Sequence, residues 1–275
     1  MPAGPTNDPV EPRAPRPVEW VDGPAGRIRV DDGGAGGVPV LFVHGLAGDR
    51  TVWREQLDRV RQTRRAIAVD LRGHGESSPS ESGDYSIPAF VADVVAVANA
   101  LKLDRFVLVG HSLGGSVAAG YAGASPERVA GILLADPSGV GTKVPRGEAE
   151  AMLRQMAPGT YARFVSRYFG ALLEGADPAC RERVLRSLRM TRREVVAGAF
   201  RGSLSWNPVP SLERYPGPKL AVVSAASRAP WSLTEVMPAL PTRRMPGTSH
   251  WPMLDRPAEF QGILSDFLSG TATEN

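Results

Sequence analysis

Short apolar runs alternate with amphipathic stretches along most of the chain. The runs lie at 38–43, 65–70, 105–110, 131–136 and 219–225. Runs dominated by apolar side chains are typical of strands buried on both faces of a sheet. Residues 87–101 and 113–124, which lie between runs, carry apolar and small residues at helical spacing. This alternation predicts an α/β fold with a mostly parallel central sheet and flanking helices.

The N-terminal segment departs from this pattern. Residues 1–17 carry six prolines and few large apolar side chains, which predicts an extended arm outside the fold. The following segment, VEWVDGPAGRIRVDDGGAGG (18–37), predicts a β-hairpin with turns at Asp22-Gly23 and Gly33–Gly37. We expect this hairpin to form the antiparallel edge of the sheet.

A long polar stretch separates the fourth apolar run from the fifth. Its Arg-rich amphipathic pattern predicts helices around 147–157, 159–173, 178–189 and 191–203. We therefore predict a helical cap at 137–217, inserted into a core domain formed by 18–136 and 218–275.

Composition narrows the classes of function. Hydrophobic residues make up 42% and charged residues 22% of the chain, and the formal net charge is only +3, with scattered basic residues. Neither nucleic-acid binding nor membrane residence is indicated. The lone Cys180 has no partner for a disulfide, and no signal peptide or long apolar segment is readable. We expect a cytoplasmic monomer or homodimer.

The candidate nucleophile is Ser112, in the segment Gly110-His111-Ser112-Leu113-Gly114. This G-x-S-x-G pattern falls between a predicted buried strand and a predicted helix, which is the context that gives the motif meaning. A serine at such a sharp turn exposes its hydroxyl above the sheet, and the helix start offers free N–H groups to a developing oxyanion.

Here the sequence resembles the α/β-hydrolase superfamily, in particular its capped esterase, perhydrolase and carbon–carbon hydrolase branch. The similar segments are the serine turn, LFVHGLAGDRTVW (41–53), AVDLRGHGESS (68–78) and PGTSHWPMLDRPAEF (246–260). The resemblance covers nearly the whole chain after residue 20 and implies the α/β-hydrolase fold. It also implies an oxyanion hole formed by the backbone N–H groups of Leu46 and Leu113.

The predicted general base is His250. Neutral imidazole suits proton transfer from serine near neutral pH, and His250 lies in a Pro/Gly-rich loop near the C-terminus, in agreement with the chain order Ser, acid, His. The other three histidines, His44, His74 and His111, are interpreted as structural.

The acid departs from the common pattern of the superfamily. Most relatives place Asp a few residues beyond the strand before the histidine loop, where this chain has Ser227. Asp136 directly follows another predicted strand, at a position that some relatives use, and it is our candidate to orient His250. An Asp at a strand end is also a common turn or cap residue. Without Asp136 the site would be a Ser-His dyad.

These residues predict a serine hydrolase that cleaves a small to medium, uncharged carboxylic ester through an acyl-enzyme. A lactonase, a perhydrolase or a carbon–carbon bond hydrolase would use the same residues. A ligand-binding member of the fold with weak or no turnover is the alternative of another class. No phosphate-binding loop, dinucleotide motif or metal-ligand spacing is present in the sequence, so no cofactor is implied. Several aromatic and Met side chains of the predicted cap and nearby loops can line an apolar pocket, but each is more often part of the packing between cap and core. They are Trp206, Trp231, Trp251, Met152, Met156, Tyr161, Phe164 and Phe169.

Overall fold

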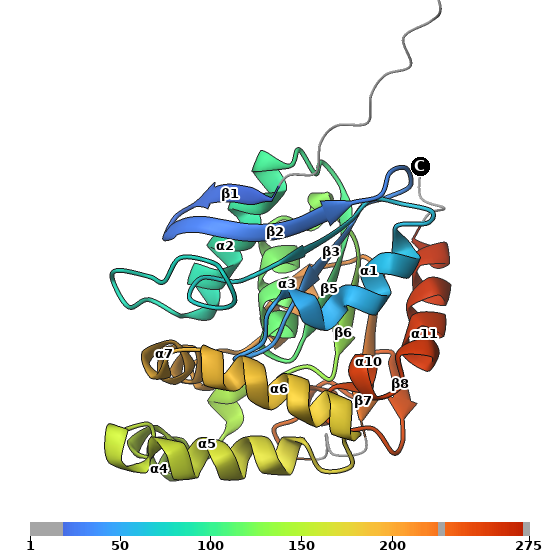
Figure 1. The fold of residues 1–275 in the computed structure, drawn as a ribbon. Coiled ribbons are helices and arrows are strands. Elements are labelled where there is room, and N and C mark those ends of the chain that lie inside the picture. Colours follow the sequence, from blue (N-terminus) through green and yellow to red (C-terminus); the bar gives the residue numbers. More distant parts are fainter. Residues whose placement is uncertain (1–18, 225–228, 272–275) are drawn as a thin grey trace, which may run out of the picture.

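The computed structural model describes residues 19–224 and 229–271. The predicted arm at 1–17 and Ser227 lie outside the described residues. Within them the strands form one sheet with the order β1-β2-β4-β3-β5-β6-β7-β8, which runs through the centre of the molecule (Figure 1). The strands are β1 (Trp20–Gly23), β2 (Gly26–Gly33), β3 (Val40–Val43), β4 (Ala66–Val69), β5 (Phe106–His111), β6 (Val129–Ala135), β7 (Lys219–Ser224) and β8 (Thr242–Met245).

The sheet is mostly parallel, as the alternation of strands and helices predicts. β1 and β2 form an antiparallel hairpin, and β2 pairs antiparallel with β4. From β4 to β8 every neighbouring pair is parallel. The hairpin is present as expected, but its turn lies at residues 24–25, because Asp22 and Gly23 are still paired with β2.

Helices cover both faces of the sheet, which explains the uninterrupted apolar runs. In β3, Leu41 and Val43 belong to one buried cluster, and Val40 and Phe42 belong to the other. Successive side chains of a strand point to opposite faces, so each face of β3 needs its own apolar cover. α2 (Ile87–Ala100) and α3 (Leu113–Ala124) pack on one face, and α1 (Arg54–Val60) and α11 (Pro257–Gly270) pack on the other (Figure 1).

β8 has no counterpart among the five apolar runs. It forms the edge of the sheet, and only Met245 is buried, whereas Arg243 and Arg244 are exposed. An edge strand is solvated on its free side and does not need a continuous apolar sequence.

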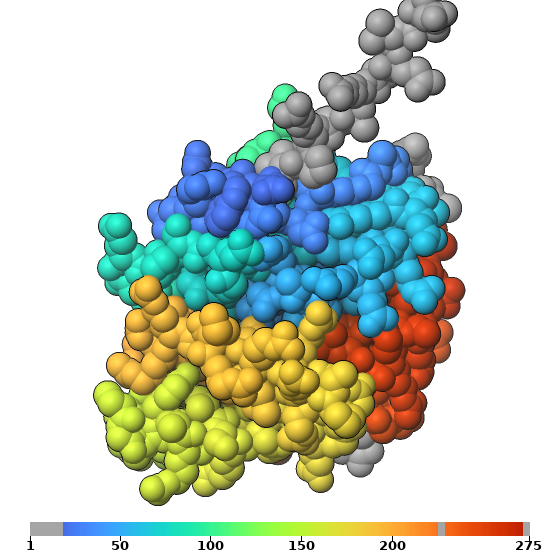
Figure 2. Space-filling model, in the orientation of Figure 1, coloured from blue at the N-terminus to red at the C-terminus, as the bar shows by residue number. Residues whose placement is uncertain are grey.

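The four helices predicted between β6 and β7 are present. They are α4 (Arg146–Arg154), α5 (Pro158–Leu172), α6 (Pro178–Met190) and α7 (Arg193–Leu204). Figure 2 shows them as one continuous layer, lime to gold, against the blue to red core, and in Figure 1 this layer lies beyond the carboxyl ends of the parallel strands. A fifth helix, α8 (Val209–Arg214), packs instead against α3 and buries Leu212 in the core.

None of the helices in the described part of the chain combines the length and apolar character needed to span a membrane.

Candidate active site

Ser112 lies in strained backbone between β5 and α3. Its φ of 50° and ψ of −117° fall in a region that non-glycine residues rarely adopt. The two flanking glycines explain how the turn can be so sharp: a Cβ on Gly110 would collide with the Gly114 carbonyl, and one on Gly114 with the carbonyls of Val43 and His44. The turn is held by a 3.0 Å hydrogen bond from the Ser112 N–H to the Ala135 carbonyl.

Asp136 follows β6 and is completely buried, also with a positive φ of 41°. Its Oδ2 accepts a hydrogen bond from His250 Nδ1 at 2.7 Å and another from Ser224 Oγ at 2.9 Å. Its Oδ1 accepts from the Ser224 N–H at 2.9 Å. Because Nδ1 of His250 is the donor to a carboxylate, a neutral His250 imidazole has its free lone pair on Nε2, where it can accept a proton.

The backbone of His250 is fixed from two directions. Its N–H donates to the Leu172 carbonyl at 3.0 Å, so α5, a helix of the layer between β6 and β7, contacts the histidine loop directly. Its carbonyl accepts from His111 Nε2 at 2.7 Å. Burial and the neighbouring His250 lower the pKa of His111 to about 3, so His111 is neutral and its single N–H is on the nitrogen that faces this carbonyl.

Asp255 organises the same loop, a role for which the sequence analysis gave no expectation. Its Oδ2 accepts from the Ser249 N–H at 2.7 Å and from Ser249 Oγ at 2.6 Å. Its Oδ1 lies 3.4 Å from the Asp177 N–H, at the start of α6. A carboxylate six residues after Ser249 therefore closes the turn that presents His250.

The three histidines interpreted as structural make structural contacts. His44 Nδ1 donates to the Gly45 carbonyl at 2.7 Å, and its Nε2 accepts from the Leu71 N–H at 3.0 Å. Burial lowers the pKa of His44, which favours this neutral form. His74 is also buried, which lowers its pKa to about 3, and its Nδ1 lies 3.0 Å from the Arg72 carbonyl.

The backbone around Leu46 packs directly against the serine turn. A Cβ added to Gly45 would lie 2.6 Å from His111 Nδ1 and 3.0 Å from Ser112 Cβ. Leu113 is the first residue of α3, where an N–H has no acceptor within the helix. Within the described residues, neither the Leu46 nor the Leu113 N–H donates a hydrogen bond to the protein.

The Ser112 hydroxyl lies 3.5 Å from the Ser138 hydroxyl. No hydrogen bond between Ser112 Oγ and the His250 imidazole is formed among the described residues. Catalytic hydrogen bonds are often long in structures without substrate and tighten in the complex.

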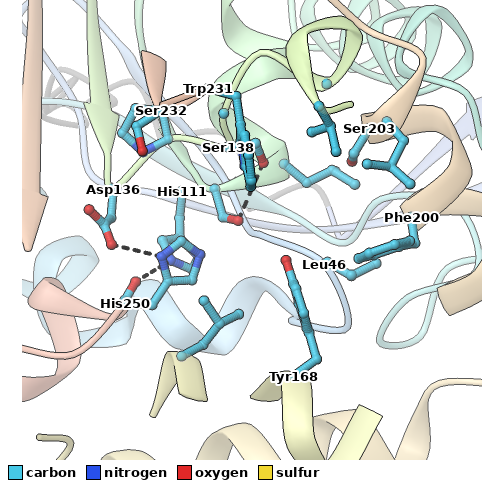
Figure 3. A pocket seen from close by; sticks show the side chains of 18 of the residues that line it. Leu46, His111, Asp136, Ser138, Tyr168, Phe200, Ser203, Trp231, Ser232 and His250 are labelled. Atoms are coloured by element: carbon cyan, nitrogen blue, oxygen red, sulfur yellow. Dashed lines mark hydrogen bonds and ion pairs between the residues drawn. The ribbon is translucent and has the colours of Figure 1, made fainter. Parts of the chain in front are cut away.

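One cavity of about 220 Å³ brings the predicted site residues together. Ser112, His250, Asp136, Leu46 and Leu113 all line it, and Figure 3 shows the Asp136–His250 contact on one side and Leu46 on the other. No Lys or Arg is among its lining residues in the described chain, and no group of three His, Cys, Asp or Glu suited to a metal occurs in that part of the structure.

Most of the apolar lining comes from the cap and the loops beside it. Of the residues left unassigned by sequence, Trp231, Trp251, Met152 and Phe169 line the cavity. Trp206, Met156, Tyr161 and Phe164 do not, and instead contribute to packing. The lining also includes residues that sequence reasoning did not single out: Tyr168, Leu172, Phe200, Ser203, Leu204, Ser138 and Ser232. Helical periodicity gives no signal for which cap side chains face a cavity.

Comparisons with known proteins find similarity over most of the chain. The profile of the family described as "Alpha/beta hydrolase family" matches residues 40–261. A solved structure of a thermophilic esterase from Thermogutta terrifontis is 26% identical, with a TM-score of 0.79 over 94% of this chain and 100% of that one. An enzyme described as degrading N-acyl homoserine lactones is 29% identical, with a TM-score of 0.74 over 90% of this chain and 99% of that one.

One curated relative matches only in part. The dihydrolipoyllysine-residue acetyltransferase component of the acetoin cleaving system of Cupriavidus necator is 34% identical over 149 residues, which is 54% of this chain and 40% of the relative's length. The chain thus spans less than half of this relative.

Proposed function

The chain belongs to the alpha/beta hydrolase family, and from that premise we propose that it is a serine hydrolase that cleaves small to medium, uncharged carboxylic esters through an acyl-enzyme. The observation that carries the proposal is the 2.7 Å hydrogen bond between His250 Nδ1 and the buried Asp136, in the cavity that Ser112 also lines. This arrangement supplies a nucleophile, a base and a group that orients the base.

In the proposed first half-reaction, His250 Nε2 takes the proton of Ser112 Oγ as this oxygen forms a bond to the ester carbonyl carbon. The carbonyl oxygen becomes an oxyanion, which the N–H groups of Leu46 and Leu113 bind. In comparable sites one such donor lowers the activation barrier by roughly 3 kcal/mol. Asp136 stabilises the imidazolium that forms. The C–O bond then breaks, and His250 returns the proton to the leaving alcohol.

In the proposed second half-reaction, His250 takes a proton from water, which attacks the acyl carbon. The tetrahedral intermediate collapses with release of the carboxylic acid, and the proton returns to Ser112. In both half-reactions the activation barrier is lowered because the N–H donors to the oxyanion are already in place before the negative charge develops.

The preference for an uncharged substrate follows from the cavity wall. A substrate carboxylate placed there would lose its hydration without gaining a Lys or Arg partner among the described lining residues. The volume of about 220 Å³ suits a small to medium group.

Lactone hydrolysis is the second candidate, because a structural neighbour of 29% identity is described as degrading N-acyl homoserine lactones. A lactone is a cyclic ester, so the same residues would open it by the same steps.

The experiment is steady-state hydrolysis of p-nitrophenyl esters from acetate to decanoate by the wild type, Ser112→Ala and Asp136→Asn. The proposal predicts turnover by the wild type and a loss of at least about a hundredfold in both variants. Hydrolysis of a lactone series relative to open-chain esters of the same acid separates the two candidates. A wild type inert toward every ester and lactone would instead favour carbon–carbon bond hydrolysis or the ligand-binding alternative.

The cytoplasmic location and the monomeric or homodimeric state stay predictions from the sequence.

A further inference from the structure

One wall of the cavity carries a phenol hydroxyl that makes no hydrogen bond to the described part of the protein. Tyr168 lies on α5 and lines the cavity, and Figure 3 shows its hydroxyl pointing into the cavity, toward the side where Ser138 lies. Among the described residues this oxygen neither donates nor accepts a hydrogen bond. The hydroxyl therefore faces whatever occupies the cavity.

The ring of Tyr168 is held by three other aromatic side chains. It stacks on Phe164 with 5.8 Å between ring centroids, and it meets Phe169 and Phe200 edge to face at 5.7 and 5.3 Å. Such contacts fix the direction of the ring. The hydroxyl is thus positioned before a ligand binds, at little further cost in side-chain entropy.

The surroundings of the ring also set the chemical character of the hydroxyl. Desolvation raises the pKa of Tyr168 to about 12, so the phenol is protonated at every working pH and can donate a hydrogen bond. Two other wall hydroxyls are engaged: Ser203 Oγ donates to the Ala199 carbonyl at 3.1 Å, and Ser138 Oγ lies 3.5 Å from Ser112 Oγ. A ligand that left the Tyr168 donor unpaired in this mainly apolar wall would remove its hydration without replacing the lost hydrogen bond.

We propose that Tyr168 is a specificity-determining residue, which donates a hydrogen bond to a second, uncharged carbonyl oxygen of the substrate, separate from the carbonyl that Ser112 attacks. This inference rests on the proposed ester or lactone hydrolysis and narrows its substrate class to oxo-substituted compounds. A carboxylate is a poor second acceptor, because no Lys or Arg lines the described cavity and a buried anion needs a charged partner.

The test uses matched substrates that differ only in the second oxygen. On the acyl side these are p-nitrophenyl hexanoate and its 4-oxo and 5-oxo derivatives. On the alcohol side they are hexyl acetate and 5-oxohexyl acetate. The values of kcat/KM are measured for the wild type, Tyr168→Phe and Tyr161→Phe. Tyr161 lies on the same helix but does not line the cavity, so its Phe variant is the matched control.

We expect Tyr168→Phe to lose about fivefold more activity on at least one oxo ester than on the ester that lacks the oxo group, which is the size of one neutral hydrogen bond. The loss should appear mainly in KM, and Tyr161→Phe should not discriminate between the paired esters. The Phe side chain keeps the aromatic packing, and thermal unfolding of each variant verifies the fold.

Equal losses on oxo and plain esters would overturn the inference, since they would mean that Tyr168 only packs. A p-nitrophenyl monoester of adipate that is hydrolysed better than the 5-oxohexanoate would also overturn it, by showing that the second acceptor is charged. Both results leave the proposed function standing, because plain esters are still hydrolysed. A wild type inert toward all of these esters would contradict the proposed function itself.

Discussion

Asp136 and His250 lie 114 residues apart in the chain, and their side chains meet through a 2.7 Å hydrogen bond between Oδ2 and Nδ1. Asp136 directly follows β6, and the neighbouring β7 contributes no carboxylate. The last residue of β7, Ser224, instead donates two hydrogen bonds to Asp136. Carboxyl ends of adjacent parallel strands meet at one edge of a sheet. A carboxylate moved from one strand end to the next can therefore still reach the same histidine.

Replacement of Asp136 by Asn should reduce kcat/KM on p-nitrophenyl butyrate by at least about a hundredfold, because the amide can favour the wrong tautomer of His250 and cannot stabilise the imidazolium. The substitution keeps the volume of the side chain, and circular dichroism verifies the fold. Asp104→Asn is the control, since Asp104 is exposed. Near-wild-type activity of Asp136→Asn would remove Asp136 from the mechanism.

Replacement of Gly114 by Ala should prevent the native packing of the serine turn. The added Cβ would collide with the backbone carbonyls of Val43 and His44, which cannot move without disturbing β3 and the loop after it. A Cβ added to Gly170, in α5, would meet no atom within 4 Å. Gly170→Ala should therefore raise the free energy of unfolding by about 0.5–1 kcal/mol through helix propensity. Urea unfolding of both variants measures the contrast, and equal stabilities would contradict this account of the turn.

Much of the fold could be predicted because local sequence and tertiary environment agree. β3 is apolar throughout and β5 is apolar up to Val109, and both strands are buried on both faces, so their positions are visible in the sequence. The glycines around Ser112 also leave a local signature, since the sharp turn itself requires them. Asp136 could be named as the candidate acid because no carboxylate follows β7 before Glu235.

The features that the sequence did not predict depend on contacts between segments that are distant in the chain. β8 is an exposed edge with two arginines, so its sequence has no strand pattern. The direction of the Tyr168 hydroxyl is set by Phe200, which lies on another helix. The hydrogen bond from the His250 N–H to the Leu172 carbonyl involves only backbone atoms, and no side-chain pattern can reveal it.

Acid should destabilise the protein through its buried histidines. Burial lowers the pKa of His74 and of His111 to about 3, whereas both titrate near 6.5 when unfolded. Between these values the unfolded state binds more protons, so the free energy of unfolding falls as the pH drops below about 6.5. Between pH 8 and pH 5.5 the two histidines together should lower the free energy of unfolding by about 3 kcal/mol.

The His74→Asn variant isolates one of these contributions. Asn retains a donor near the Arg72 carbonyl, which His74 Nδ1 contacts in the wild type. The difference in unfolding free energy between pH 8 and pH 5.5, measured by urea denaturation, should shrink by about 1.4 kcal/mol in the variant. An unchanged difference would show that His74 is not kept neutral by burial.

The cap should contribute to activity through its contact with the histidine loop. Phe169, which is 2% exposed, stacks on Trp251 with 6.2 Å between ring centroids, one helical turn before the Leu172 carbonyl that holds His250. Phe169→Ala should lower the free energy of unfolding by about 3–5 kcal/mol and reduce kcat. Met190→Ala in α6 is the control, because Met190 is 81% exposed. Full kcat in a folded Phe169→Ala variant would show that the cap does not support the histidine.

The central claim is that Ser112 forms the acyl-enzyme, and it is tested most directly by mass spectrometry of the intact protein after reaction with a fluorophosphonate, followed by peptide mapping. The account predicts one adduct per chain in the wild type, located on Ser112, and no adduct on Ser112→Ala treated in the same way. A folded wild type that forms no adduct, or one that carries the adduct on another residue, would contradict it.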